Sequence, residues 1–112
     1  MKLIRDKYVD CIKPENLRKS TDYEEKLGFI LDKIKEELIE YLDSKCRDPM
    51  ELADVMQAVI DLGNLHGHSF DLVNKLRKEK EEKLGGFKDF IILKNMTPNL
   101  NYTLSSDTEE HF

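Results

Sequence analysis

The fold is decided by residues 22–66, which read DYEEKLGFILDKIKEELIEYLDSKCRDPMELADVMQAVIDLGNLH. In Asp22–Asp43 apolar residues recur mostly at steps of three and four, the period of a helix with one apolar face. Residues Pro49–His66 repeat this pattern with a wider apolar face. Because residues 44–47 form so brief a connection, we expect an antiparallel helical hairpin. The apolar stripes comprise Leu27, Ile30, Ile34, Leu38, Tyr41 and Leu42 in the first helix, and Leu52, Val55, Met56, Val59, Ile60, Leu62 and Leu65 in the second.

Both helices carry start signals. Thr21 or Asp22 can cap the first helix by accepting hydrogen bonds from its free N–H groups. In the second helix Asp48 is the expected N-cap, and Pro49 suits the first helical position. Glu51 falls where the glutamate of a capping box belongs. These signals place the start of the first helix near residue 22 and the start of the second directly after the connection.

A third helix is expected from Phe70 to Leu84. Ser69 can cap its start, and Gly85 with Gly86 stops it. Its second half, residues 77–83, is wholly charged, so it is either solvated or faces a charged ligand. The third helix therefore adds little apolar surface of its own to a core.

The remaining segments complete a single-domain chain of 112 residues. Residues 1–10 lack a clear helical period, and residues 11–21 form a connection. Residues 87–93 are an apolar-rich segment that could pack across the bundle. The polar residues 95–112 are expected to form a flexible tail. We therefore predict an all-α fold: an antiparallel helical bundle over residues 1–94, with a short irregular N-terminal segment.

Composition excludes several classes of partner. The chain has 18 Lys and Arg and 23 Asp and Glu, which gives a net charge of −5. This balance argues against polymeric nucleic acid or an anionic membrane as the main partner. Residues 1–20 carry six basic and three acidic side chains. Any positive potential at a site should therefore come largely from this end of the chain.

The same composition indicates a cytoplasmic protein with no membrane partner. The longest uncharged runs fall far short of the ~20 residues that span a bilayer. The first residues contain no apolar segment of the kind that forms a secretory signal. Cys11 and Cys46 are then expected to be reduced thiols rather than a disulfide.

Two acidic pairs flank the connection between the first two helices. A step of three places Glu37 beside Glu40 on one helix and Glu51 beside Asp54 on the next. A hairpin brings the pairs together, where four carboxylates repel one another unless a cation lies between them. Hard oxygen ligands without histidine or thiolate select Mg²⁺, Mn²⁺ or Ca²⁺ over zinc. The spacing therefore predicts a divalent-cation site.

Each of these acidic residues also has a simpler interpretation. Runs of glutamate commonly form solvated helix faces. Glu51 could serve only the capping box of Asp48, and Asp54 could be an ordinary surface acid. The metal interpretation is favoured by a coincidence: two such pairs, each beginning at the edge of an apolar stripe, with one short turn between them.

At these residues the chain resembles the all-α nucleoside triphosphate pyrophosphohydrolases, the MazG superfamily. Residues 36–40, EELIE, and residues 51–54, ELAD, match its Glu-Glu-x-x-Glu and Glu-x-x-Asp signature. Residues 2–7, KLIRDK, resemble the Lys-Leu-Val-Arg-Asp-Lys opening of a small, phage-rich, phosphoribosyl-ATP pyrophosphohydrolase-like branch. Residues 80–87 resemble that branch's closing Lys/Arg-Gly-Gly-Phe motif. The chain departs from the branch at residues 8–9, where Tyr-Val replaces Ile-Pro, and in a shorter stretch between the acidic motifs.

The resemblance implies a helical bundle that works as a homodimer or homotetramer. It also implies Mg²⁺-dependent hydrolysis of a nucleotide between its α and β phosphates, giving a monophosphate and pyrophosphate, with Mn²⁺ as a possible substitute. Carried onto this chain, Mg²⁺ would be held by Glu37, Glu40, Glu51 and Asp54. Glu36 would orient or deprotonate the attacking water. The basic groups expected to contact the substrate are Lys2, Arg5, Lys7, Lys80 and Lys83.

One alternative stays open at this point. The wide apolar face of residues 52–65 and the shortened spacing also suit a non-catalytic helical module that binds a nucleotide or a protein partner. The preferred base has no local motif in this sequence.

Overall fold

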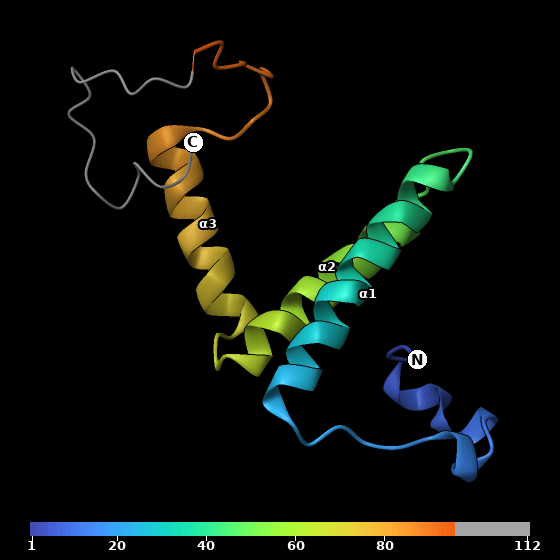
Figure 1. Cartoon of the computed structure of the whole chain (residues 1–112). Coiled ribbons are helices and arrows are strands. Elements are labelled where there is room, and N and C mark those ends of the chain that lie inside the picture. Colours follow the sequence, from blue (N-terminus) through green and yellow to red (C-terminus); the bar gives the residue numbers. More distant parts are fainter. Residues whose placement is uncertain (96–112) are drawn as a thin grey trace.

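The computed structural model describes residues 1–95, and all the regular secondary structure among them is helical (Figure 1). The long helices begin and end within one residue of the predicted positions. From residue 96 onward the predicted flexible tail lies outside the described residues. The elements in chain order are the 3₁₀ helices η1 (Asp6–Cys11) and η2 (Pro14–Asn16) and the helices α1 (Tyr23–Asp43), α2 (Pro49–Leu65) and α3 (Phe70–Leu84).

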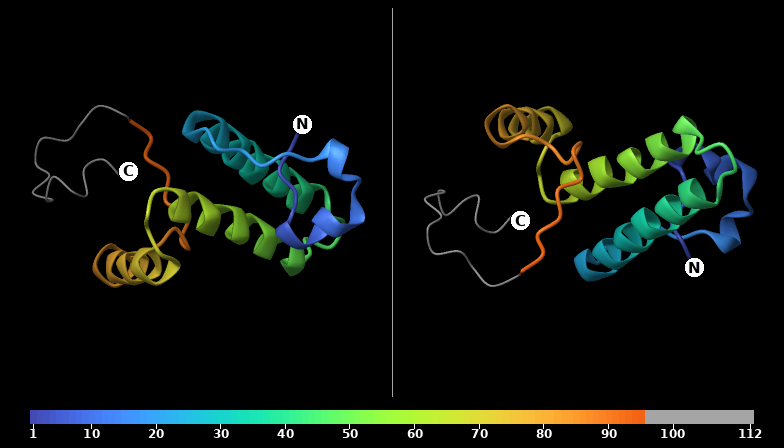
Figure 2. Two further views of the ribbon diagram at one scale, coloured as in Figure 1. Left: turned by 90° about the horizontal axis from the view of Figure 1, so that it is seen from below. Right: turned by 90° about the horizontal axis from the view of Figure 1, so that it is seen from above.

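Helices α1 and α2 form the predicted antiparallel hairpin and lie side by side in each view (Figures 1 and 2). Ser44 organises its turn, because its hydroxyl donates to the Tyr41 carbonyl (2.7 Å) and accepts from the Asp48 N–H (3.1 Å). Arg47 has a positive φ of 50° and donates to the carbonyl oxygens of Leu42 and Ser44, both at 2.7 Å. These bonds satisfy carbonyl groups left free at the end of α1.

The predicted caps are confirmed. The Asp22 carboxylate accepts from the Glu25 N–H at 3.0 Å, so Asp22 rather than Thr21 caps α1. The Asp48 carboxylate accepts from the Met50 N–H at 2.9 Å. The Ser69 hydroxyl accepts from the Leu72 N–H at 3.2 Å and begins α3.

A tight turn between α2 and α3 sets the direction of the third helix. The Gly63 carbonyl accepts from the His68 N–H at 2.8 Å. A Cβ atom at Gly63 would lie 2.9 Å from the His68 carbonyl oxygen, so this approach requires glycine. Gly67 has a φ of 77°, which also favours glycine. As a result α3 leaves the hairpin at the end of α2 and diverges from it (Figure 1).

The apolar segment of residues 87–93 does not pack across the bundle. Phe87 and Ile91 are 85% and 89% exposed. Gly85 ends α3 with a φ of 82° at the far end of a helix that already points away from the hairpin. The segment therefore covers no apolar surface of its own chain. We call α3 together with residues 85–93 the arm.

The N-terminal segment, residues 1–20, runs beside the hairpin (Figure 2). It is irregular as predicted, apart from η1 and η2, which begin after extended residues and end within two turns. Leu3 and Ile4 are half-buried against the hairpin. This packing brings the basic end of the chain to the acidic helices.

A single chain has very little core. Among residues 1–95 the buried apolar side chains are Ile30 and Ala58, at 8% and 4% exposed. The described residues therefore form a hairpin with a projecting arm rather than a closed bundle. No helix among them is both long enough and apolar enough to cross a membrane. Several apolar side chains of the hairpin remain exposed, including Leu31, Leu38, Leu42, Leu52, Met56 and Val59.

Candidate metal and nucleotide site

The hairpin brings the predicted acidic pairs together. Carboxylate oxygens of Glu36, Glu37 and Glu40 lie within 4.8 Å of one another, and so do those of Glu37, Glu51 and Asp54. Glu37 belongs to both groups and is only 8% exposed. These five residues, the carboxylate cluster, thus meet around one buried glutamate.

Turn geometry excludes the capping-box role of Glu51. In a capping box its carboxylate would accept from the Asp48 N–H. That N–H donates instead to the Ser44 hydroxyl at 3.1 Å. Glu51 is therefore free to face α1, where it lies close to Glu37 and Asp54.

Basic side chains partly neutralise the cluster. Lys33 Nζ lies 3.3 Å from Glu37 Oε1 and 3.5 Å from Glu36 Oε2, and its side chain is 20% exposed. Lys2 Nζ lies 3.3 Å from Glu36 Oε1. Arg5 forms an ion pair with Asp54. Sequence reasoning missed Lys33, although its position four residues before Glu37 places both on one side of α1.

Charge repulsion distinguishes two of the glutamates. The negative charge of Glu37 is the largest cause that raises the pKa of Glu40, followed by partial burial. Burial also acts to raise the pKa of Glu36, but the hydrogen bond from Lys2 and the charge of Lys33 outweigh it and lower that pKa. Glu36 is thus held ionised, whereas Glu40 would gain most from a bound cation.

A groove of about 450 Å³ opens beside the cluster, between the N-terminal segment and the hairpin. We call it the acidic groove. Gln57 and Asp61 also line it, with Gln57 Nε2 donating to Asp61 Oδ2 at 3.3 Å. Sequence reasoning missed both, although they follow Asp54 by three and seven residues and so share its face of α2. Its full lining is Leu3, Ile4, Arg5, Asp6, Ile30, Lys33, Glu37, Asp54, Gln57, Ala58 and Asp61.

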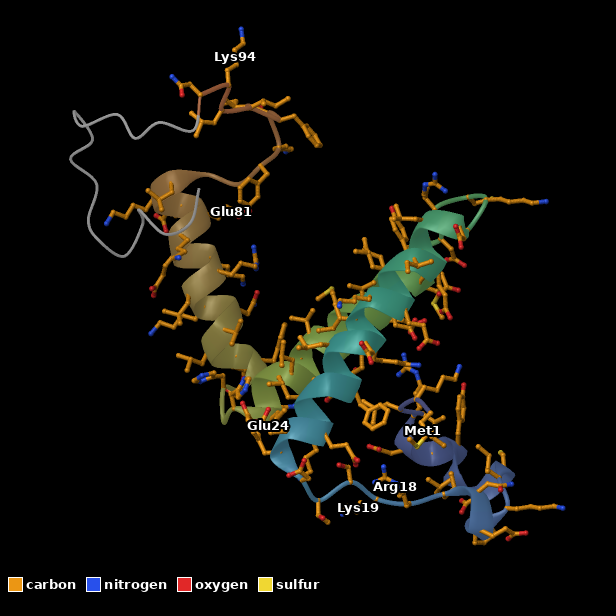
Figure 3. The ribbon with its side chains drawn as sticks, viewed as in Figure 1. Met1, Arg18, Lys19, Glu24, Glu81 and Lys94 are labelled. Atoms are coloured by element: carbon orange, nitrogen blue, oxygen red, sulfur yellow. The ribbon has the colours of Figure 1, made fainter. Side chains whose placement is uncertain are left out.

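The structure brings some predicted substrate contacts to the site and not others. Lys2 and Arg5 reach the carboxylates. Lys7 is exposed on η1 and does not line the acidic groove. Lys80 and Lys83 lie near the far end of α3, close to the Glu81 that Figure 3 labels, and away from the cluster of the same chain.

The ligand set fits a hard divalent cation. Every group of three or more close metal-binding side chains among residues 1–95 consists of carboxylates. Such oxygen donors, without histidine or thiolate, suit Mg²⁺ or Mn²⁺.

Comparisons of the chain with models of protein families, with curated proteins and with solved structures gave no match. The functional interpretation therefore depends on the residues of this chain.

Proposed function

We propose that the protein is a Mg²⁺-dependent nucleotide pyrophosphohydrolase that cleaves a nucleoside triphosphate between its α and β phosphates. The observation that supports this most is the buried Glu37, shared by carboxylate groups from two facing helices. The resemblance of the acidic motifs and of residues 2–7 to the MazG superfamily supports the same reaction. The acidic groove beside Glu37 offers room for a ligand.

In this proposal Glu37, Glu40, Glu51 and Asp54 hold Mg²⁺. The bound ion would supply charge neutralisation at the phosphates and a more acidic water. Glu36, kept ionised by two lysines, accepts a hydrogen bond from the attacking water and so orients it.

Basic residues of the N-terminal segment bind the phosphates. A guanidinium can contact two phosphate oxygens at once, so Arg5 is a better phosphate contact than a lysine. In the structure Arg5 pairs with Asp54. Lys2, which pairs with Glu36, adds a second positive charge on the same side of the cluster.

We also propose that a second copy of this chain covers the exposed apolar surfaces of the hairpin and the arm. Phe87 and Phe90 are 85% and 83% exposed, and two such rings offer roughly 250–400 Å². A standard interface buries about 800 Å² on each partner. The two rings would supply a third to a half of this area, and the exposed face of the hairpin would supply the rest.

Pyrophosphate release tests the proposed reaction. We would assay the purified protein with Mg²⁺ or Mn²⁺ against canonical and modified ribo- and deoxyribonucleoside triphosphates. Glu37→Gln and Asp54→Asn should abolish release while the helical circular dichroism signal is retained. Glu24→Gln, an exposed acid in the first turn of α1, is the matched control and should keep full activity.

Two outcomes would contradict the proposal. One is the absence of pyrophosphate release from every nucleotide in the panel with either metal. The other is full activity in Glu37→Gln. Calorimetric titration with Mg²⁺ and a non-hydrolysable nucleotide then identifies the alternative, because tight binding without turnover indicates a non-catalytic binding module.

A further inference from the structure

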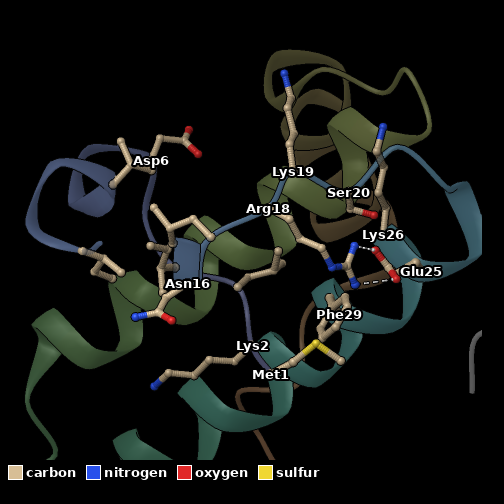
Figure 4. A pocket seen from close by; sticks show the side chains of 15 residues that line it. Met1, Lys2, Asp6, Asn16, Arg18, Lys19, Ser20, Glu25, Lys26 and Phe29 are labelled. Atoms are coloured by element: carbon tan, nitrogen blue, oxygen red, sulfur yellow. Dashed lines mark hydrogen bonds and ion pairs between the residues drawn. The ribbon is translucent and has the colours of Figure 1, made fainter. Parts of the chain in front are cut away.

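A second groove, of about 790 Å³, lies between the N-terminal segment and the first half of α1 (Figure 4). We call it the apolar groove. Its volume is typical of a site for a small molecule, and such sites are mostly apolar with a few polar groups at their walls. Its apolar lining includes Leu3, Ile4, Val9, Ile12, Leu17 and Phe29.

The apolar groove adjoins the acidic groove. Leu3, Ile4 and Asp6 line both of them. A ligand longer than either groove can therefore extend from one into the other past the N-terminal segment. At one end it would meet apolar walls, and at the other it would meet the carboxylate cluster.

The order of side chains along α1 indicates the chemistry of such a ligand. Phe29, Lys33 and Glu37 follow at steps of four and so lie on one side of the helix. Phe29 lines the apolar groove, whereas Lys33 and Glu37 line the acidic groove. The series is an aromatic ring, a cation and a carboxylate that would hold metal, over about 12 Å of helix. This matches the base, the phosphates and the metal of an extended nucleotide.

Polar groups stand at the wall of the apolar groove near Phe29. Arg18 donates two hydrogen bonds to the Glu25 carboxylate, at 2.7 and 2.8 Å (Figure 4). Lys19 and Lys26 add positive charge to the lining. The groove thus combines an aromatic face with charged hydrogen-bonding groups, which suits a flat heterocycle with a polar edge.

We propose that the apolar groove binds the nucleoside part of the substrate, with the nucleobase stacked against Phe29. This inference rests on the proposed function for the phosphate end of the ligand. Stacking on an aromatic ring tolerates every base, so Phe29 contributes affinity, while the polar wall reads the edge of the base.

Binding of nucleosides without metal or phosphate tests this inference. We would titrate the isotope-labelled, metal-free protein with adenosine, guanosine, cytidine, uridine and their deoxy counterparts, and follow amide shifts by NMR. At least one nucleoside should shift the residues that line the apolar groove in a saturable way. Phe29→Leu keeps an apolar side chain and removes the aromatic face, so it should weaken binding at least fivefold.

Two further variants separate this inference from the proposed reaction. Phe70→Leu, the same substitution at the start of α3 and outside both grooves, should leave nucleoside binding unchanged. Glu37→Gln should also leave it unchanged, because the carboxylate cluster does not touch the nucleoside. Nucleoside binding without any hydrolysis would contradict the proposed function alone.

The inference is overturned if no nucleoside gives saturable shifts in the groove, or if Phe29→Leu binds as well as wild type. Shifts that follow protein concentration instead of nucleoside concentration would show that a second copy covers the groove, and would also overturn it. In the hydrolysis assay, Phe29→Leu should raise KM for the nucleotide at least fivefold. The inhibition constant of Mg²⁺-tripolyphosphate, which has no base, should not change.

Discussion

Glu37→Gln should remove the stabilisation of the protein by Mg²⁺ without unfolding it. In the metal-free protein Glu37 experiences repulsion and attraction together. Each of the four carboxylates within 4.8 Å of Glu37 repels it by at least about 3.5 kcal/mol at an effective dielectric constant of 20. Lys33 at 3.3 Å contributes about 5 kcal/mol of opposite sign at the same dielectric constant. Because the amide removes both effects and the repulsion is the larger, the metal-free variant should melt no lower than wild type.

Added Mg²⁺ should then separate the two proteins. At a metal concentration 100 times the wild-type Kd, binding stabilises the folded state by about 2.7 kcal/mol. For a domain of this size that is a rise in Tm of roughly 10–20 °C. If the loss of one shared ligand weakens binding a hundredfold, the same metal concentration contributes about 0.4 kcal/mol. The rise in Tm should then fall to a few degrees.

The assay is thermal unfolding followed by circular dichroism, with and without MgCl₂ at matched ionic strength. Calorimetry on wild type supplies the Kd that sets the metal concentration. Glu24→Gln removes an equal charge from the exposed first turn of α1 and should keep the full rise in Tm. A full Mg²⁺-dependent rise in Glu37→Gln would refute the reasoning, and so would a wild-type protein that neither Mg²⁺ nor Mn²⁺ stabilises.

Four further predictions follow from the contacts and charges described above. Because the pKa of Glu40 is raised above 4.5, the Tm of the metal-free protein should fall as pH rises through and beyond that value, and Mg²⁺ or Glu40→Gln should remove the fall. The hydrogen bond from Arg18 lowers the pKa of Glu25 to about 2, so stability should be lost as pH falls from 4.5 towards 2; Arg18→Ala should flatten this loss, and an unchanged acid profile would contradict it. Arg5→Ala should raise KM for the nucleotide at least about tenfold through the loss of a charged contact, and an unchanged KM would exclude Arg5 as a phosphate contact. Ile91→Asp, which places a charge on the arm, should shift sedimentation towards a single chain, whereas a monomeric wild type would contradict the proposed second copy.

Features encoded over a few neighbouring residues could be predicted from the sequence. The helix starts depend on the side chains of Asp22, Asp48 and Ser69, each of which accepts from an N–H two or three residues later. The meeting of the acidic pairs needs only the helical repeat and a short turn. Because both are local, the sequence predicts the hairpin and the carboxylate cluster together.

Contacts between distant segments could not be predicted in the same way. Arg5 and Asp54 are 49 residues apart, and no periodic pattern links them. The apolar groove likewise depends on where the irregular N-terminal segment lies against α1. The apolar composition of residues 87–93 indicates that they need a cover but does not reveal whether the same chain supplies it. The sequence therefore allows these residues to pack across the bundle, whereas in the structure they are exposed.

The turn at Ser44 has a consequence for how such a chain can change during evolution. Surface connections usually accept insertions and deletions with little effect. Here one added residue would separate the Ser44 hydroxyl from the Asp48 N–H and free α2 to rotate by about 100° per residue. Glu51 would then leave Glu37. We expect length changes at this turn to be rarer than substitutions, since the length of the turn fixes the angular position of α2.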